Sequence, residues 1–234
     1  MKKKTALPIA LVLILVASLL AQHSQPPAQA VAQPSINWID LAKAAWNYFQ
    51  PGFGVSPSGI NYAHNTWHFI TDWDLGCYVS AIIDAEALGI LLSDGPWGAN
   101  DRIEKVLNFL SNRPLHPTGV PYSAYNSDTF QPYDDNPSNP SDAGRLLIAL
   151  YRLKKAKPQL APRIDYVVGR NGFAKFANSV QTNGFYGYYI AHGFYLWGYT
   201  TPQVSAALKT PDTAWSTSMV DACLLYTSPS PRDR

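Results

Sequence analysis

The segment Thr71-Asp-Trp-Asp-Leu-Gly-Cys-Tyr-Val-Ser-Ala81 decides the fold that the sequence predicts. Thr71 and Asp74 have the spacing of a capping box, in which two side chains satisfy free backbone N–H groups at the start of a helix. The apolar residues that follow recur at helical spacing and predict an amphipathic helix over about residues 72–92. The helix start also carries two carboxylates and the indole of Trp73, a combination that suits a sugar-binding wall.

Helical periodicity continues along the chain. A strand is expected only near residues 119–125, so the fold class is all-α. A proline-rich loop over about residues 112–140 holds several rings and acids. We expect this loop to form the lid or rim of a pocket; a plain surface connection is the alternative. The other expected helices span residues 36–49, 100–110, 141–155, 158–180 and 188–197.

Both ends of the chain are expected to lie outside the folded domain. Lysines at 2–4, an apolar run over 6–21 and a small-x-small site at 28–30 predict a secretory signal over residues 1–30, with a linker at 31–35. An uncleaved membrane anchor is the alternative. Residues 223–234 resemble a translated sequencing adapter from assembled environmental DNA; a genuine disordered tail is the alternative. One truncated domain over residues 36–222 remains, in a protein that we expect to be secreted or extracytoplasmic.

The charge balance excludes some classes of protein. The chain has 18 basic and 16 acidic residues, and removing the three signal lysines leaves 15 against 16. A near-neutral domain argues against a nucleic-acid binder, which needs a clustered basic surface. The 7 Trp and 14 Tyr residues must fill the core or line a surface.

We expect no metal ion and no other cofactor. His64 and His68 have the i,i+4 spacing that can hold zinc on a helix, but their segment lacks a helical pattern and a glutamate between them. The sequence has no Gly-rich phosphate loop and no Gly-x-Ser-x-Gly nucleophile motif.

Three motifs carry a resemblance to a known family: Thr71 to Ala81, then Asp142-Ala-Gly-Arg-Leu-Leu147, then Tyr188 to Gly198. With them the chain resembles an uncharacterised family of secreted bacterial and archaeal proteins. That family in turn resembles the glucoamylase-like α/α-toroid glycosidases, including those that act on β-1,2-glucans. The resemblance covers roughly residues 36–208. It implies a ring of helical hairpins, about half of it present here, with a pocket at the N-terminal ends of the inner helices.

The candidate catalytic residues are carboxylates at two helix starts. We expect Asp74, or Asp72 if the capping box occupies Asp74, to act as a base or to bind substrate. A carboxylate in a first helical turn is stabilised in its charged form, so it is a poor general acid. Asp142 lies at the start of a second helix that Ser141 can cap, and with Arg145 it has the spacing of an i,i+3 pair on the helix face. In the functional reading, which makes Asp142 a candidate catalytic residue, it lines the same pocket and Arg145 fixes its orientation.

The general acid is expected elsewhere, because Glu86 and Glu104 lie well inside predicted helices. It would come from the loop, at Asp128, Asp134 or Asp135, or from residues beyond the end of the chain. Phe194 and Trp197 are predicted core residues. The predicted substrate-binding residues share aromatic or polar side chains near the proposed pocket: Trp73, Trp67, Arg145, Tyr125, Asp128, Tyr188, Tyr189 and His192.

The sequence therefore favours a secreted protein that binds a polysaccharide or oligosaccharide. A carboxylate pair can also hydrolyse a glycosidic bond, so we expect a possible glycoside hydrolase of a glucan or another polysaccharide. The alternative is a noncatalytic cell-surface or envelope module that binds glycans or proteins.

Overall fold

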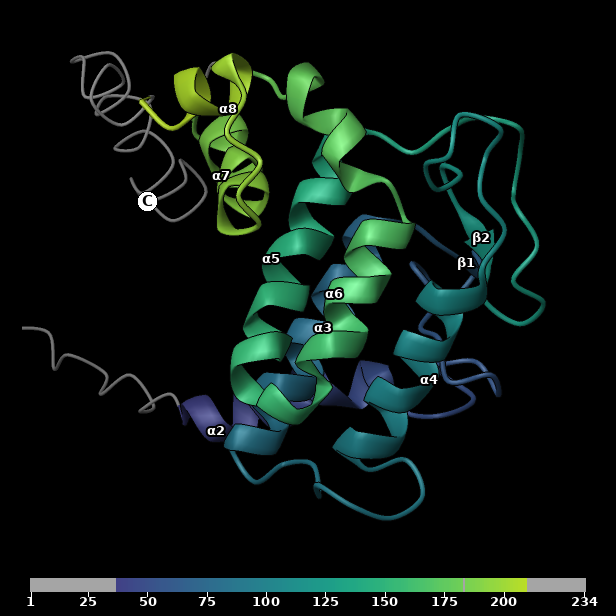
Figure 1. Ribbon diagram of the computed structural model, residues 1–234. Helices are drawn as coiled ribbons and strands as arrows, with labels where there is room; N and C mark the ends of the chain where they lie inside the picture. The colour runs from purple at the N-terminus through teal and green to yellow at the C-terminus, as the bar shows by residue number, and fades with distance from the viewer. Residues whose placement is uncertain (1–36, 183, 210–234) are drawn as a thin grey trace, which may run out of the picture. The chain divides into compact units, whose positions relative to one another are not determined.

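The structure is a computed structural model that describes residues 37–182 and 184–209 (Figure 1). The predicted signal, linker and adapter-like tail lie outside the described residues. Within the described part, no helix is both long and apolar enough to cross a membrane.

Helices dominate the described residues, so the predicted all-α class is confirmed. The two strands, β1 (Phe69–Ile70) and β2 (Tyr125–Asn126), form one short antiparallel pair. The α-helices are α2 (Trp38–Trp46), α3 (Asp72–Ala87), α4 (Ala99–Asn112), α5 (Pro140–Ala156), α6 (Ala161–Arg170), α7 (Gly184–Leu196) and α8 (Pro202–Ala207). Three 3-10 helices are η1 (Asn47–Phe49), η2 (Pro158–Leu160) and η3 (Phe173–Ser179).

The capping box at the start of α3 is confirmed. The Asp74 N–H donates to Thr71 Oγ1 at 3.3 Å, and the Thr71 N–H donates to Asp74 Oδ2 at 3.4 Å. The predicted end at Leu92 is wrong, because α3 stops at Ala87. Gly89 has a φ of +67°, and the Ile90 N–H donates back to the Ala85 carbonyl at 2.8 Å, which is a glycine-based helix end.

The helices form two rows, as expected for a toroid-like arrangement of hairpins. In the first row, α5 packs between α3 and α7, with the starts of all three helices near one another (Figure 1). In the second row, α4 packs on α3 and α6 packs on both α4 and α5. The last helix, α8, packs on α7 and was not predicted. The predicted toroid-like fold is confirmed.

Glycines allow α5 and α7 to pack backbone to backbone. A Cβ at Gly193 would lie 2.2 Å from the Gly144 carbonyl oxygen, and a Cβ at Gly144 would lie 2.8 Å from the Ile190 carbonyl oxygen. Such distances are far below van der Waals contact, so these two helices could not approach as closely with any larger residue at these positions.

Apolar side chains from both rows form one core. Phe194 is fully buried, as predicted. Trp197 packs against the core only partly buried, and its Nε1–H donates to the Leu147 carbonyl at 2.9 Å. Fully buried core residues include Leu75, Val79, Ile82, Val106, Leu110, Leu146, Leu150, Ile164 and Val204.

Two predicted helix bounds are corrected. The helix expected over residues 158–180 is interrupted after Arg170, where Gly172 adopts a φ of +62°. The helix expected from residue 188 already begins at Gly184.

The long loop between α4 and α5 is folded against the helices. The ring of Tyr125 is buried and meets the ring of Phe109 in α4 edge-on, with centroids 5.4 Å apart. The ring of Phe130 also packs on Phe109, with centroids 5.0 Å apart. Tyr125 also pairs with Ile70 across the β1–β2 ladder. The loop is therefore anchored by its own core, and its role as a pocket lid or rim stays a prediction.

Candidate functional site

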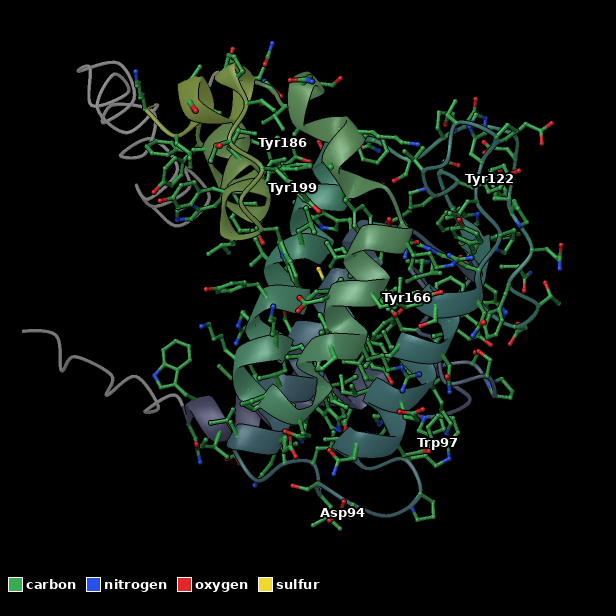
Figure 2. All side chains as sticks on the ribbon, viewed as in Figure 1. Asp94, Trp97, Tyr122, Tyr166, Tyr186 and Tyr199 are labelled. Atoms are coloured by element: carbon green, nitrogen blue, oxygen red, sulfur yellow. The ribbon has the colours of Figure 1, made fainter. Side chains whose placement is uncertain are left out.

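The candidate site lies where α3, α5 and α7 begin. Asp72, Trp73 and Asp74 occupy the first turn of α3, and Asp142 occupies the first turn of α5. Tyr186, labelled in Figure 2, lies in the first turn of α7, and its ring stacks on Trp73 with centroids 5.7 Å apart. Three helix starts thus bring acidic and aromatic side chains together, as the sequence predicted.

Asp72 is held in a buried ion pair. Its side chain is 2% exposed and accepts two hydrogen bonds from the guanidinium of Arg113, at 2.5 and 3.2 Å. Arg113 follows α4 and also donates to Asn171 Oδ1 at 2.7 Å. These bonds fix Asp72 and make it a structural anchor between α3 and α4, in place of the substrate-facing base that the sequence suggested.

Asp74 combines a capping role with partial exposure. In addition to the backbone bonds of the capping box, its Oδ2 accepts a hydrogen bond from the Thr71 hydroxyl at 2.8 Å. The side chain also lies close enough to Tyr48 that, together with burial, its charge raises the pKa of that phenol. Asp74 is therefore oriented by local bonds and remains partly accessible.

Asp142 is the acid with an unusual environment. Burial, followed by the nearby negative charge of Asp72 and then that of Asp74, raises the pKa of Asp142 from 3.8 to about 7. A hydrogen bond from Asn139 Nδ2 at 3.2 Å lowers the pKa of Asp142, but burial and the two neighbouring charges raise it by more. Asp142 can therefore hold a proton near neutral pH, which a general acid requires.

The cap of α5 differs from the prediction. Asn139, not Ser141, caps the helix, because Asn139 Oδ1 accepts from the backbone N–H groups of Ser141 and Asp142 at 2.9 and 3.1 Å. Pro140 then occupies the first helical position, which its fixed φ favours. The Asn-Pro pair was the signal that could have identified this helix start.

Arg145 contacts α7 instead of Asp142. Its Nη1 donates to the Tyr189 hydroxyl at 2.7 Å, and among the described ion pairs none joins Arg145 to Asp142, so the predicted i,i+3 pair is absent. Tyr189 lies 6.1 Å from Trp73 by ring centroids. Trp73, Arg145 and Tyr189 therefore belong to one cluster, as predicted, and Tyr186 joins it although it was not predicted. Its i,i+3 spacing from Tyr189 was the available signal.

Two other predicted residues of α7 lie apart from this cluster. Tyr188 and His192 contact each other at 5.2 Å between centroids, and His192 stacks with Tyr195 at 6.3 Å. Their described ring contacts run along α7 itself, so the structure does not bring them to Asp74 or Asp142.

Three other residues predicted to bind substrate, two in the loop and one just before β1, contact the loop and the segment beside it. Tyr125 is 1% exposed, and its hydroxyl donates to the Pro114 carbonyl at 2.7 Å, so the prediction that it faces a substrate is wrong. Asp128 is exposed and accepts from the Tyr62 hydroxyl at 3.2 Å. Trp67 packs against Phe69 and Tyr133, with ring centroids 5.3 and 5.6 Å away.

The loop acids are poor substitutes for Asp142 as a proton donor. Hydrogen bonds from Ser123 and Asn136 lower the pKa of Asp134, which opposes a role as general acid. Asp128 and Asp135 are exposed to solvent, so the fold encloses neither carboxyl. Among these acids, Asp142 is thus the carboxyl with a raised pKa, whereas the pKa of Asp134 is lowered.

The two histidines with zinc-like spacing lie outside any helix. His64 Nδ1 is 2.9 Å from Thr66 Oγ1, and the His68 ring stacks on Tyr62 at 3.9 Å. Across the residues that the structure describes, no group of three or more His, Cys, Asp or Glu side chains is placed to hold a metal ion.

Comparison with known proteins assigns the family. A family model described as "Protein of unknown function (DUF3131)" matches residues 40–219. The chain belongs to this family. No curated protein matches the sequence significantly.

One solved structure is similar to this DUF3131 protein. It is the crystal structure of a "putative glucoamylase" from Bacteroides fragilis NCTC 9343, which is 17% identical and superimposes with a TM-score of 0.46. The match covers 71% of this chain and 48% of that chain, so the protein described here spans about half the length of the glucoamylase-like one.

Proposed function

We propose that this protein is a secreted, carbohydrate-directed glycoside hydrolase that uses Asp74 and Asp142. The observation that carries the proposal is the unlike environments of two carboxylates at one site. Asp74 is bound into a capping box, whereas burial and the charges of Asp72 and Asp74 raise the pKa of Asp142 to about 7. A pair of acids in contrasting environments is the arrangement that hydrolysis of a glycosidic bond requires.

In the proposed reaction, the two acids have complementary roles. Asp142 donates its proton to the glycosidic oxygen as the bond from that oxygen to the anomeric carbon breaks. Asp74 acts on the other side of the sugar. As a base, it takes a proton from the water whose hydroxyl group the anomeric carbon gains; as a nucleophile, it forms a bond to that carbon, which water then breaks while the deprotonated Asp142 takes the proton of the water.

The cluster beside the acids suits a sugar ring. Trp73 and Tyr186 offer an aromatic surface for the apolar face of a pyranose. Arg145 and the Tyr189 hydroxyl, already 2.7 Å apart, offer polar groups for its hydroxyls. We propose that a polysaccharide or oligosaccharide is the partner of this cluster.

Release of reducing sugar from a panel of glucans tests this function. We expect the full-length gene product to be active, and Asp142→Asn to lower the rate at least a hundredfold because the proton donor is lost. The wild-type rate should fall as the pH rises above about 7, where Asp142 loses its proton. Asp135→Asn, a change to an exposed loop acid, is the matched control.

The double variant Asp74→Asn, Asp142→Asn provides the decisive comparison. Activity equal to that of the wild type would remove both residues from the mechanism.

One observation favours a noncatalytic glycan-binding module as a second candidate. Asp74 Oδ2 already accepts bonds from the Thr71 side chain and backbone, an arrangement that a binding residue tolerates better than a base. Calorimetry that detects oligosaccharide binding to the complete protein without any turnover would support this alternative against hydrolysis.

A further inference from the structure

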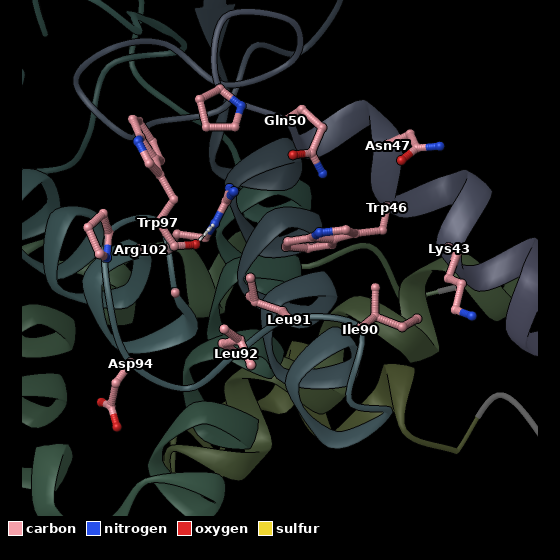
Figure 3. A pocket seen from close by; sticks show the side chains of 13 residues that line it. Lys43, Trp46, Asn47, Gln50, Ile90, Leu91, Leu92, Asp94, Trp97 and Arg102 are labelled. Carbon is pink, nitrogen blue, oxygen red and sulfur yellow. Dashed lines mark hydrogen bonds between the residues drawn. The ribbon is translucent and has the colours of Figure 1, made fainter.

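A cleft lies at the end of the helical rows opposite the candidate site. It has a volume of about 620 Å³ and is formed by the end of α2, the segment that follows α3, and the start of α4 (Figure 3). Asp94 and Trp97 of its wall lie far from Tyr186 of the candidate site (Figure 2). This cleft is within the size range of small-molecule sites, and the proposed hydrolase mechanism does not use it.

A buried guanidinium forms part of the cleft wall. Arg102 is 2% exposed and lies between two indoles, with its Cζ 5.1 Å from the Trp46 ring centroid and 5.5 Å from that of Trp97 (Figure 3). Its Nε–H donates to the Trp97 carbonyl at 2.7 Å, and its Nη1 donates to the Phe49 carbonyl and the Tyr78 hydroxyl at 2.9 and 2.8 Å. Three of its five N–H groups are thereby satisfied.

The remaining two N–H groups, on Nη2, donate to none of the described residues. Within the described part of the chain, Arg102 also forms no ion pair with a carboxylate. The neighbouring Asp101 accepts instead from Lys105 Nζ at 2.7 Å and from the Trp97 N–H at 2.9 Å. The hydrogen bond from Lys105 and, more weakly, the charge of Arg102 lower the pKa of Asp101, so this carboxylate is the nearby anion of Arg102 although no ion pair joins the two. The N–H groups on Nη2 are left to bind an anionic group of a ligand in the cleft.

The rest of the cleft offers an apolar wall and a polar rim. Trp46 and Leu91 provide apolar surface, and the amide of Gln50 faces the same space (Figure 3). Lys43 adds a second positive charge to the lining, where its side chain is 60% exposed and its Nζ lies 3.9 Å from Asp40 Oδ1 in an exposed ion pair. The one acid of the lining, Asp94, accepts from Asn100 Nδ2 at 2.7 Å.

We propose that this cleft binds an acidic sugar, with its carboxylate on Arg102. A uronate combines the three features that the walls match: an anionic group for the free Nη2, a ring face for Trp46 and Leu91, and hydroxyls for Gln50. The inference goes beyond the proposed hydrolase function and stands without it, because binding here can be measured in a chain whose Asp74 and Asp142 are both changed to Asn.

Titration calorimetry of the full chain with glucuronate, glucose, acetate and phosphate tests the proposal. We expect glucuronate to bind at least tenfold more tightly than glucose, since only glucuronate supplies a carboxylate to Arg102. Arg102→Lys should abolish this preference. Lys43→Glu, at an exposed position that leaves the core intact, should weaken glucuronate binding about three- to tenfold by reversing this charge of the lining.

Lys155→Glu is the matched control, because it reverses an exposed charge on α5 and does not line the cleft. The proposal is overturned by equal affinities for glucuronate and glucose, by no binding of glucuronate, or by equal effects of the Lys43 and Lys155 changes. Acetate or phosphate binding as tightly as glucuronate would overturn the sugar assignment. Loss of glucan hydrolysis in the Asp74 and Asp142 variant with unchanged glucuronate binding would separate the two sites.

Discussion

Asp142 is the residue on which the proposed hydrolysis depends. A position in the first turn of a helix favours the charged form of a carboxyl. Here that effect is outweighed, because burial and then the charges of Asp72 and Asp74 oppose ionisation. A proton held near neutral pH is thus a property of the starts of α3 and α5 acting together.

This proton links the stability of the fold to pH. The unfolded chain releases it near the ordinary pKa of 3.8, whereas the folded protein keeps it up to about pH 7. The stability that this difference contributes is complete below pH 4 and is lost as the pH rises to about 7. Between pH 4 and 8, the wild type should lose about 2 kcal/mol of unfolding free energy relative to Asp142→Asn, after allowance for solvent screening.

Urea unfolding of both proteins at several pH values measures this difference. A constant gap between wild type and Asp142→Asn across the range would show that Asp142 titrates normally.

Asp72 has the opposite character, because its charge is fully paired. With Arg113 it forms an ion pair whose side chains are 2% and 1% exposed. Removing one member leaves the other charge buried and unpaired. We therefore expect Asp72→Ala to lower the free energy of unfolding by about 3–5 kcal/mol.

The exposed pair of Asp84 and Arg152 supplies the control for this prediction, with side chains 56% and 42% exposed. Asp84→Ala should cost less than about 1 kcal/mol. Similar losses for the two variants in urea unfolding would mean that Asp72 is not buried with Arg113 as described.

At the scale of the elements, the contact between α5 and α7 positions the aromatic cluster beside Asp142. It depends on Gly144 and Gly193, where a side chain would overlap the facing backbone. Because α7 supplies both Tyr186 and Tyr189, any separation of these helices would move the rings away from Trp73.

Replacing Gly193 tests this packing. Alanine favours a helix over glycine by about 1 kcal/mol, but its Cβ at residue 193 would lie 2.2 Å from the Gly144 carbonyl oxygen. We expect the cost of overpacking to exceed the gain in helix propensity. Gly193→Ala should therefore lower the free energy of unfolding by about 1–3 kcal/mol, measured by thermal or urea unfolding.

Gly169 in α6 is the matched control, since a Cβ there meets nothing within 4 Å. Gly169→Ala should be neutral or more stable by up to about 1 kcal/mol. A stabilised Gly193→Ala would contradict the close approach of the helices.

The sequence predicted most elements because their signals are local. The Thr71 capping box and the apolar spacing of α3 specify that helix without knowledge of its neighbours. The C-terminal ends of the helices were harder to predict. Gly89 and Gly172 stop helices through left-handed backbone conformations, which the spacing of apolar residues does not reveal. Helix α8, only six residues long, is too short to show a period.

At the scale of the whole molecule, the candidate site was only partly predictable. Helical starts rich in acids and rings indicated Trp73, Asp74 and Asp142, and the fold brings them together. Contacts between residues far apart in the sequence could not be predicted, because no local pattern identifies the two partners. Arg113 lies 41 residues from Asp72 and still forms its ion pair, and the burial of Tyr125 depends on Phe109 of another element.

The two ends of the helical rows carry different groups. Acids and aromatic rings gather where α3, α5 and α7 begin, whereas the guanidinium of Arg102, which forms no ion pair among the described residues, lines the cleft at the other end. These contrasting charges predict that the two ends select ligands of different charge.

The titration of Asp142, followed by NMR of its labelled side-chain carboxyl carbon, tests most directly whether the acidic starts of α3 and α5 converge. The account predicts an apparent pKa of about 7 in the wild type and a lower value in Asp74→Asn, where one neighbouring charge is removed but the cap can still form. A pKa near 4 that Asp74→Asn leaves unchanged would contradict it, because Asp142 would then lie in solvent, apart from the other acids.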